Sequence, residues 1–329
     1  METIGIIGAG AWGTALAIAL RRAGRAVTLY AHEPEVVEAV NTRHENVPFL
    51  PGVTLDSAIR ATGDLDHACN GDAVLLVAPS LYMRAVCRQA RPHWNAGVPA
   101  VICTKGIEQE SCLLMSEVIG ETLGDAVPLA VLSGPTFAAE VAADLPAAVT
   151  LACADAELGG RLIAAIGSAR FRPYLSHDII GAQLGGAVKN VLAIACGIVE
   201  GRGLGDNARA ALITRGLAEI AKLGEVLGAD IRTLMGLSGL GDLTLTCNAM
   251  QSRNFSLGHA LGKGRKLNDI LAERQSVAEG VHNAFSVTEL ARRNQVDMPI
   301  CQAVDAVINV EADLDSIIYG LLSRPLNTE

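Results

Sequence analysis

The sequence has few aromatic residues and more negative than positive charge. Only 3% of its 329 residues are aromatic although half are apolar, so the core must be built from Ala, Val, Leu and Ile. Such a core favours α/β and helical packing over a β-sandwich. The formal net charge of −9 at pH 7 argues against a nucleic-acid partner or an anionic-membrane surface. The length suffices for two domains and at least one large core.

Paired cysteine motifs are also lacking. The eight cysteines, at positions 69, 87, 103, 112, 153, 196, 247 and 301, include no CxxC pair and stand mostly in apolar runs. This pattern is typical of reduced core residues in a cytoplasmic protein. It indicates neither a disulfide scaffold nor a metal site.

Two apolar stretches must be tested as membrane segments. Residues 4–20 end at Arg21-Arg22, but Met1-Glu2-Thr3 lacks the positive charge of a signal peptide and the stretch is rich in glycine. Residues 179–199 carry Lys189 as their only charge, and a charge near the centre of a span costs about 2.5–3.5 kcal/mol. We therefore expect a buried helix there and no membrane insertion.

The stretch from Ile4 to Ala17 combines a short apolar run with the glycine pattern GAGAWG and a run of small and aliphatic residues. It predicts a buried strand, a tight turn and a helix. Gly8 would permit the turn, Gly10 would let backbone N–H groups approach a pyrophosphate, and Gly13 would allow close helix–strand packing. Glycine-rich turns are common, but this one has the strand and helix that a dinucleotide site requires.

Further strand patterns alternate with helical ones over about 180 residues. Strands are predicted at 26–30, 72–78, 99–103, 129–132, 147–152 and 169–174, with a loop at 46–52. The pattern predicts an α/β fold with a Rossmann-type doubly wound sheet. From about residue 178 the pattern is helical only, so we expect domains at 1–178 and 179–329, the second of them all-helical.

Polar or glycine-containing clusters follow three of these strands directly, at Pro79-Ser80, Lys105-Gly106 and 134–136. Ligands of such sheets bind beyond the carboxyl ends of the strands, so these clusters indicate a site. The second strand ends at Ala31-His32-Glu33, where adenosine-ribose contacts are expected. An acidic residue there favours a free 2′-OH, but His32 leaves the choice between NAD and NADP open, and Glu33 one position on does not settle it.

Two lysines are candidates for chemistry. Lys189 stands alone in a long apolar helix, where desolvation would lower its pKa toward a value suited to a general acid or base. The alternative is a lysine whose stem lies along the helix surface and whose charge reaches water. Lys105 follows a buried strand at the ligand edge, and its alternative is an ordinary exposed loop lysine.

Asp242 and the run Ser252-Arg253-Asn254 are further candidates. Asp242 lies in an apolar, glycine-spaced loop, where a carboxylate needs a cationic partner or several donors. It could instead cap a helix that begins at Leu243. The Ser-Arg-Asn run offers a hydroxyl, a guanidinium and an amide suited to phosphate oxygens, and its alternative is a solvated helix start.

Nine motifs in order resemble the bacterial NAD(P)-dependent glycerol-3-phosphate dehydrogenases over nearly the whole chain. They stand at residues 8–17, 77–80, 103–107, 132–138, 187–191, 203–219, 236–247, 252–254 and 276–280. The resemblance implies a Rossmann domain followed by a helical domain like the C-terminal domain of 6-phosphogluconate dehydrogenase. It further implies interconversion of sn-glycerol 3-phosphate and dihydroxyacetone phosphate with NAD or NADP and no metal. Reduction for glycerophospholipid synthesis is the expected direction, and a homodimer is compatible with the resemblance.

The resemblance also assigns roles to residues. The catalytic ones are Lys189 as proton donor or acceptor, Lys105 and Asp242. The substrate-binding ones are Lys105, Gly134, Thr136, Lys189, Asn190, Asp242, Ser252, Arg253 and Asn254. The cofactor-binding ones are Gly8, Gly10, Ala11, Trp12, Gly13, His32, Lys105, Ala138, Arg253, Val277 and Glu279.

In the mechanism that we expect, protonated Lys189 donates to the ketone oxygen while Lys105 adds positive potential. Asp242 and Asn190 would hold Lys189, and Arg253 with Asn254 would fix the phosphate. Two other functions stay open from the sequence. One is a reductase of the β-hydroxyacid dehydrogenase type, and the other is a non-catalytic redox sensor that binds NAD(P).

Overall fold

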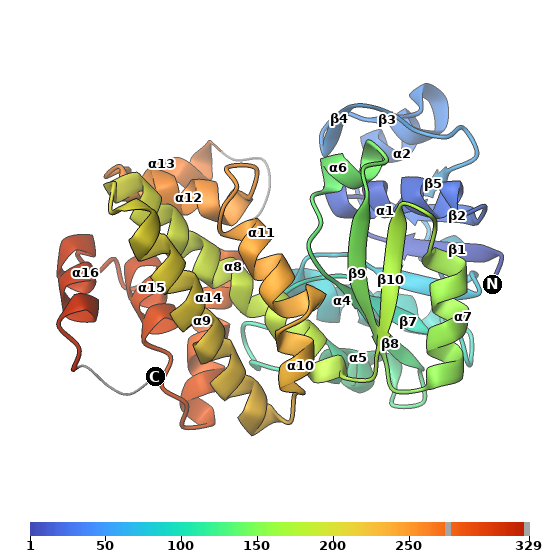
Figure 1. Ribbon diagram of the computed structural model, residues 1–329. Helices are drawn as coiled ribbons and strands as arrows, with labels where there is room; N and C mark the ends of the chain where they lie inside the picture. Colours follow the sequence, from blue (N-terminus) through green and yellow to red (C-terminus); the bar gives the residue numbers. More distant parts are fainter. Residues whose placement is uncertain (274–277, 326–329) are drawn as a thin grey trace.

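The computed structural model describes residues 1–273 and 278–325, and its N-terminal half is built on an eight-stranded sheet (Figure 1). The strand order is β10-β9-β8-β7-β6-β1-β2-β5. The strands are β1 (Thr3–Ile7), β2 (Ala26–Tyr30), β5 (Arg60–Thr62), β6 (Ala73–Leu76), β7 (Ala100–Ile102), β8 (Leu129–Ser133), β9 (Ala147–Cys153) and β10 (Phe171–Ser176). The predicted Rossmann-type sheet is confirmed.

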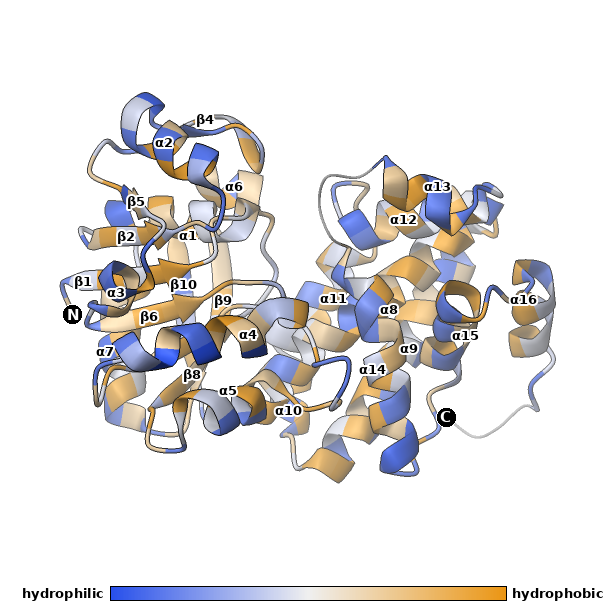
Figure 2. Cartoon of the chain, turned by 180° about the vertical axis from the view of Figure 1, so that it is seen from behind, coloured by the Kyte–Doolittle hydropathy of each residue, from blue (hydrophilic) through white to orange (hydrophobic). Residues whose placement is uncertain are grey.

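Helices cover both faces of this sheet because its strands are apolar on both sides. Ile4 and Ile6 of β1 pack in the cluster that contains α1 (Ala11–Arg22), α2 (Pro34–Arg43) and α7 (Ala156–Ile166). Ile7 packs on the opposite side, with α3 (Leu65–Cys69), α4 (Ser80–Ala90) and α5 (Met115–Leu123). The strands are accordingly hydrophobic between more polar helices in Figure 2.

The last two strands of the sheet, β9 and β10, run against the direction of the other strands. β9 runs antiparallel to β8, whereas β10 is again parallel to β9. Residues 134–146, which include the short helix α6 (Ala138–Ala142), connect β8 to β9. After this connection the chain turns back beside β8, so the carboxyl end of β9 lies at the opposite edge from the glycine turn.

A small hairpin replaces the loop that we predicted near residue 46. It consists of β3 (Glu45–Asn46) and β4 (Leu50–Thr54), which pair antiparallel. The buried Asn46 fixes the hairpin to the start of α1, since its Nδ2 donates to the Ala9 carbonyl and to Thr14 Oγ1, both at 2.8 Å. The hairpin thus closes over the glycine turn.

The second half of the chain is organised around α8 (Ile179–Arg202) (Figure 1). The α-helices that pack most extensively on it are α9 (Gly205–Leu227), α11 (Asp242–Thr246), α12 (Arg253–Gly262), α14 (Glu279–Arg293) and α15 (Pro299–Asn309). In its most apolar stretch, 89% of α8 is buried inside the protein. A helix that is hydrophobic all round is buried on all sides, so α8 is a core helix, as predicted.

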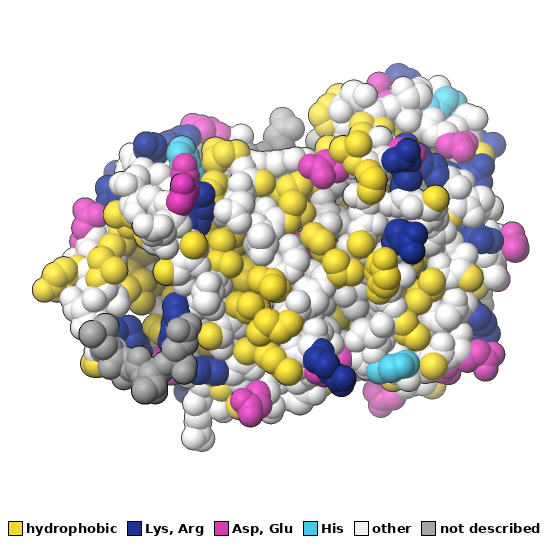
Figure 3. All heavy atoms as spheres, in the orientation of Figure 1, with side chains coloured by type: hydrophobic (Ala, Val, Ile, Leu, Met, Phe, Trp, Pro, Cys, Tyr) yellow, Lys and Arg dark blue, Asp and Glu magenta, His cyan; other side chains and the backbone are white. Residues whose placement is uncertain are grey.

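Glycines let a neighbouring helix approach α8 closely. A Cβ on Gly197 would lie 2.1 Å from the carbonyl oxygen of Phe255, and one on Gly258 would lie 2.0 Å from that of Ile194. The remaining elements are η1 (Arg91–His93), α10 (Ile231–Leu234), the π-helix η2 (Leu237–Gly241), α13 (Leu267–Ala272) and α16 (Leu314–Leu322). Figure 3 shows apolar side chains at the surface of this helical part, and α9, α10 and η2 expose Val226, Ile231 and Leu240 respectively.

The two halves share side chains across their junction. Ile107, Cys112 and Leu114, which follow β7, pack into the core of the helical half. In return, Ala182 of α8 packs into the core under the sheet. Because the cores interlock here, residues that follow β7 are held firmly against α8.

Candidate active site

Two lysines from the two halves of the chain share one buried carboxylate. Lys189 Nζ on α8 donates to Asp242 Oδ1 at 2.5 Å, and Lys105 Nζ, beyond β7, donates to Asp242 Oδ2 at 2.7 Å. Asp242 is fully buried, and the side chains of Lys189 and Lys105 are 7% and 13% exposed. Both lysines are therefore buried, and the alternative of a solvent-exposed lysine does not hold for either of them.

Local backbone structure brings these groups together. A Cβ on Gly185 would lie 2.4 Å from the Ser238 carbonyl oxygen, and one on Gly186 would lie 3.3 Å from Lys105 Cγ. Glycine at these positions lets η2 and Lys105 pack directly against α8. Asp242 is the first residue of α11, whose N-cap is Gly241, so its carboxylate is not a helix cap but faces both lysines.

Burial lowers the pKa of Lys189 to about 8. The nearby charge of Lys105 acts in the same direction, while the Asp242 carboxylate opposes it. The hydroxyl of Thr246 also accepts a hydrogen bond from Lys189 Nζ, at 2.8 Å. An ammonium group with such a pKa can donate and recover a proton near neutral pH.

Two asparagine amides hold the backbone at Lys105, and a third holds one of them. Asn190 Nδ2 and Asn283 Nδ2 donate to the Lys105 carbonyl oxygen at 3.2 and 3.1 Å. Asn254 Nδ2 donates to Asn190 Oδ1 at 3.0 Å. Asn190 thus positions Lys105, whereas we expected it to hold Lys189.

Two residues of this arrangement, Asn283 and Thr246, are not singled out by the sequence motifs. Asn283 and Ser286 are the buried polar residues of α14, among Gly280, Ala284 and Val287. A buried asparagine at helical spacing among apolar residues could have pointed to a polar partner across the junction. Thr246 stands one turn after Asp242 and could have been found by the same spacing.

The residues predicted for the substrate lie around the same lysines. Gly134 O accepts from Lys105 Nζ at 2.9 Å and from Thr136 Oγ1 at 3.2 Å. Ser252 is buried and caps α12, where its hydroxyl accepts from the Phe255 N–H. The alternative from the sequence was a solvated helix start. The run does begin a helix, but the Ser252 hydroxyl and the Asn254 amide are buried rather than solvated.

Glu279, one of the residues predicted to bind the cofactor, lies near both lysines. Burial raises the pKa of its carboxyl, and the charges of Arg253, Lys105 and Lys189 oppose that rise. Thr104 Oγ1 donates to Glu279 Oε1 at 3.3 Å. Glu279 and Arg253 therefore lie within electrostatic reach of the lysine pair, while Val277 lies outside the described residues.

The glycine turn has the geometry that its sequence predicts. Gly8 has φ of +120°, and a Cβ there would lie 2.8 Å from the Ala78 nitrogen. A Cβ on Gly13 would lie 1.8 Å from the Gly8 carbonyl oxygen, whereas one on Gly10 would meet nothing within 4 Å. Helix α1 has no side-chain cap and no acidic residue in its first turn, so its N-terminus can receive an anion.

The other predicted cofactor residues lie around this turn. Ala11 and Trp12 form the first turn of α1, and Trp12 Nε1 is buried without a hydrogen-bond partner among the described residues. Ala138 begins α6 and packs against the same core as Trp12. His32 is exposed just beyond β2, which pairs with β1 up to Ile7 and Tyr30.

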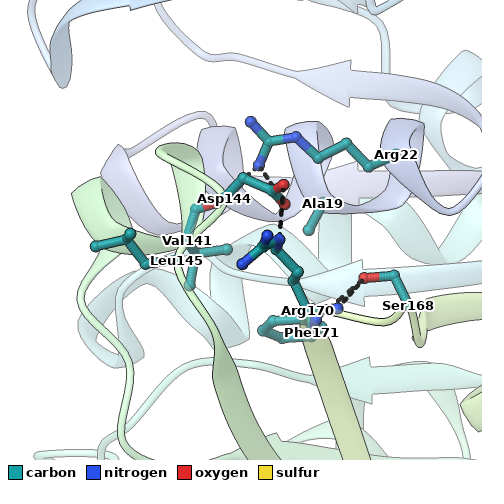
Figure 4. A pocket seen from close by; sticks show the side chains of 8 residues that line it. All are labelled: Ala19, Arg22, Val141, Asp144, Leu145, Ser168, Arg170 and Phe171. Carbon is teal, nitrogen blue, oxygen red and sulfur yellow. Dashed lines mark hydrogen bonds and ion pairs between the residues drawn. The ribbon is translucent and has the colours of Figure 1, made fainter.

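A separate hollow lies at the other end of α1 (Figure 4). Arg22 and Arg170 both pair there with Asp144, at 3.5 and 3.4 Å. Arg22 also donates to the carbonyl oxygens of Val141 and Ala142, at 2.9 and 2.7 Å. Because both arginines already have partners here, they hold the turn before β9 in place. The hollow is not part of the site around Lys105 and Lys189.

Comparison with known proteins decides the family. The model of the N-terminus of NAD-dependent glycerol-3-phosphate dehydrogenase matches residues 3–159, and that of its C-terminus matches residues 178–319. The chain belongs to this family. The glycerol-3-phosphate dehydrogenase [NAD(P)+] of Rhodospirillum rubrum is 60% identical over 330 residues, which cover 100% of this chain and 94% of the relative. That of Parvibaculum lavamentivorans is 56% identical and covers 99% and 98%.

A solved structure supports the assignment to the glycerol-3-phosphate dehydrogenases. The enzyme of Coxiella burnetii is 40% identical and superposes with a TM-score of 0.94, covering 98% of this chain and 99% of that one. The open face of Gly10 and the uncapped N-terminus of α1 fit the pyrophosphate of the NAD(P) that the family uses. Among the described residues no cluster of three His, Cys, Asp or Glu side chains could hold a metal ion.

A substitution in the glycine turn tests this fit. We expect Gly13→Ala to weaken NADH binding at least about 10-fold and to destabilise the fold, because the new methyl group collides with the Gly8 carbonyl. The matched control is Gly160→Ala in α7, where a Cβ meets nothing within 4 Å and alanine should stabilise the helix by up to about 1 kcal/mol. NADH titration and thermal denaturation of both variants would measure this. Equal behaviour of the two variants would contradict the assignment of the turn.

Proposed function

We propose that this chain interconverts sn-glycerol 3-phosphate and dihydroxyacetone phosphate with NAD(P)H, and that it works mainly as the reductase that supplies glycerophospholipid synthesis. One observation carries the proposal. A buried lysine with a lowered pKa is paired to a carboxylate that also holds a second lysine, at the sheet edge that carries the dinucleotide turn. The names of the relatives support the same reaction.

In this proposal Lys189 is the proton donor of reduction. The bound dinucleotide supplies the hydride, and negative charge develops on the ketone oxygen of the substrate. Lys189 donates its proton to that oxygen, while Lys105 contributes positive potential at the same place. Asp242 keeps both ammonium groups within reach of one substrate atom, since its two oxygens bind one lysine each.

The phosphate end of the substrate supplies binding energy. Arg253 and Asn254 begin α12, next to the buried cap Ser252, and Asn254 is tied to Asn190 and thereby to Lys105. We assign the phosphate to this helix start, together with Gly134 and Thr136. Contacts at this remote end would position the carbonyl carbon for reaction.

Phosphate dependence distinguishes this function from its alternatives. We expect rapid loss of NADH absorbance with dihydroxyacetone phosphate, and a kcat/KM at least about 10³-fold lower with dihydroxyacetone, which lacks the phosphate. Turnover of unphosphorylated 3-hydroxy acids would instead favour a β-hydroxyacid dehydrogenase. Tight cofactor binding without turnover of either substrate would favour a redox sensor.

The remaining parts of the proposal concern organisation. We divide the chain into a dinucleotide-binding domain, 1–178, and a substrate domain, 179–329, which is supported by the end of β10 at Ser176 and the start of α8 at Ile179. We place the protein in the cytoplasm, where its eight buried thiols would stay reduced. A homodimer would cover part of the apolar surface in Figure 3, and size-exclusion chromatography tests it.

A further inference from the structure

Asn283 is a buried polar residue that takes no part in the proposed proton transfer. Its side chain is fully buried on the face of α14 that also carries Gly280, Ala284 and Val287. Burial of an amide costs free energy unless its donors and its acceptor are paired. The pairs that Asn283 makes are with backbone groups outside α14, so its role lies in what those groups carry.

The amide of Asn283 binds the backbone beside both lysines of the site. Its Nδ2 donates to the Lys105 carbonyl oxygen at 3.1 Å and to the Ala187 carbonyl oxygen at 3.3 Å. Its Oδ1 accepts from the Ile107 N–H at 3.4 Å. Ala187 lies on α8, two residues before Lys189. One side chain therefore joins the segment that carries Lys105 to the part of α8 that carries Lys189.

Helix α14 also holds the backbone on either side of Lys105. A Cβ on Gly106 would lie 3.0 Å from Asn283 Oδ1, so the segment is packed closely against this amide. Thr104 Oγ1 donates to Glu279 Oε1 at 3.3 Å, and Glu279 lies one turn before Asn283 on α14. The backbone around Lys105 is thus fixed relative to α14.

We infer that Asn283 is a positioning residue that sets the distance between the two lysines, and thereby how effectively Lys105 assists proton transfer from Lys189. This role rests on the proposed function and adds a residue to it. Asn190, which lies on α8, donates to the same Lys105 carbonyl oxygen, so loss of Asn283 would loosen the segment rather than release it. A displacement of about 1 Å can still cost about 10²-fold in rate.

Kinetics of Asn283→Ala test this role first. We expect kcat with dihydroxyacetone phosphate to fall by about 10- to 10²-fold, because Lys105 is no longer held in place. The Kd of NADH, measured by titration of the same preparation, should stay largely unchanged, since the glycine turn lies in the other half of the chain. Thermal denaturation would record any loss of stability separately.

The pKa of Lys189 gives a readout that a loss of stability alone would not change. The titratable groups that face Lys189 are Asp242 and Cys247 from α11 and its C-cap, Lys105 from beyond β7, and Glu279 from α14. The charge of Lys105 lowers the pKa of Lys189. If Lys105 moves away, this pKa should rise above about 8, and the descending limb of kcat for reduction should move to higher pH.

The same pKa can be measured without turnover. The sequence contains only five lysines, at positions 105, 189, 222, 263 and 266. NMR of enzyme with isotope-labelled lysine should therefore give few signals, and Lys189→Met would identify the signal of Lys189. A pH titration should show a higher pKa in Asn283→Ala than in the wild type. If the wild type had no turnover, the proposed reaction would fail, while this titration would still decide the role of Asn283.

A core substitution on the same helix is the matched control. Val287→Ala removes buried apolar volume from α14 but no hydrogen bond to residues 104–107, so it should keep the wild-type kcat and the wild-type pKa of Lys189. Asn283→Ser retains a hydroxyl, should give smaller changes in the same directions, and decides the matter if Asn283→Ala does not fold. Wild-type kcat and pKa in a folded Asn283 variant, or equal changes in Val287→Ala, would overturn the inference.

Discussion

Lys189→Ala should lower kcat for reduction of dihydroxyacetone phosphate by about 10²- to 10⁴-fold and largely spare NADH binding. The variant loses the proposed proton donor but keeps the glycine turn, which lies on the other half of the chain. Asp242 stays paired with Lys105 in the variant, so no uncompensated carboxylate is left in the core. Steady-state kinetics and NADH titration of the same preparation would measure both quantities.

Two further variants isolate the proton-transfer role. Lys189→Met keeps the apolar stem and most of the volume, so it should fold stably and lose as much kcat as the alanine variant. Lys222→Ala removes an exposed lysine of α9 and should behave like the wild type. Near-normal kcat in Lys189→Met would exclude Lys189 as the proton donor.

The pH dependence of kcat gives an independent readout of Lys189. In the proposed mechanism reduction requires the protonated lysine, so kcat should be constant below the pKa and fall as the pH rises through about 8. Oxidation of glycerol 3-phosphate requires the neutral amine and should increase over the same range. These opposite profiles should both disappear in Lys189→Met.

The sequence predicted the part of the site that depends on unusual residues in regular elements. Lys189 is visible because a charge in an apolar helix is costly, and Lys105 because it directly follows a buried strand. The structure adds the reason why both can be buried, namely one carboxylate between them. Asp242 was recognisable as needing a cation, but no local pattern tells which lysine it binds, because the three residues lie far apart in the chain.

Other features escaped prediction because they depend on the packing of several elements. The antiparallel direction of β9 beside β8 leaves no mark in its apolar sequence, which suits either direction. The hairpin at residues 45–54 has few alternating apolar residues and forms because Asn46 binds the backbone of the glycine turn. The π-helical turn before Asp242 contacts α8 at Gly185, where a Cβ would collide with the Ser238 carbonyl oxygen, and no periodicity reveals this contact.

Asp242→Asn should be the most damaging single change at the site. The amide keeps the shape but removes the carboxylate that pairs directly with both buried ammonium groups, so we expect the free energy of unfolding to fall by about 3–5 kcal/mol. The repulsion between the lysines would also lower the pKa of Lys189 further. The descending limb of the reductive pH profile should therefore move to lower pH, and kcat at neutral pH should fall at least about 10²-fold.

Two controls separate the buried charge from simpler effects. Asp315→Asn breaks an exposed ion pair with Arg202 and should cost less than about 1 kcal/mol. Thr246→Val removes only the hydroxyl that accepts from Lys189, so it should fold well and shift the pH profile slightly. If Asp242→Asn lost no more unfolding free energy than Asp315→Asn and kept the wild-type pH profile, the burial and the pKa of the two lysines would not depend on this carboxylate. A shifted profile in a folded Asp242→Asn protein would show that one carboxylate sets both the stability of the junction and the acidity of its proton donor.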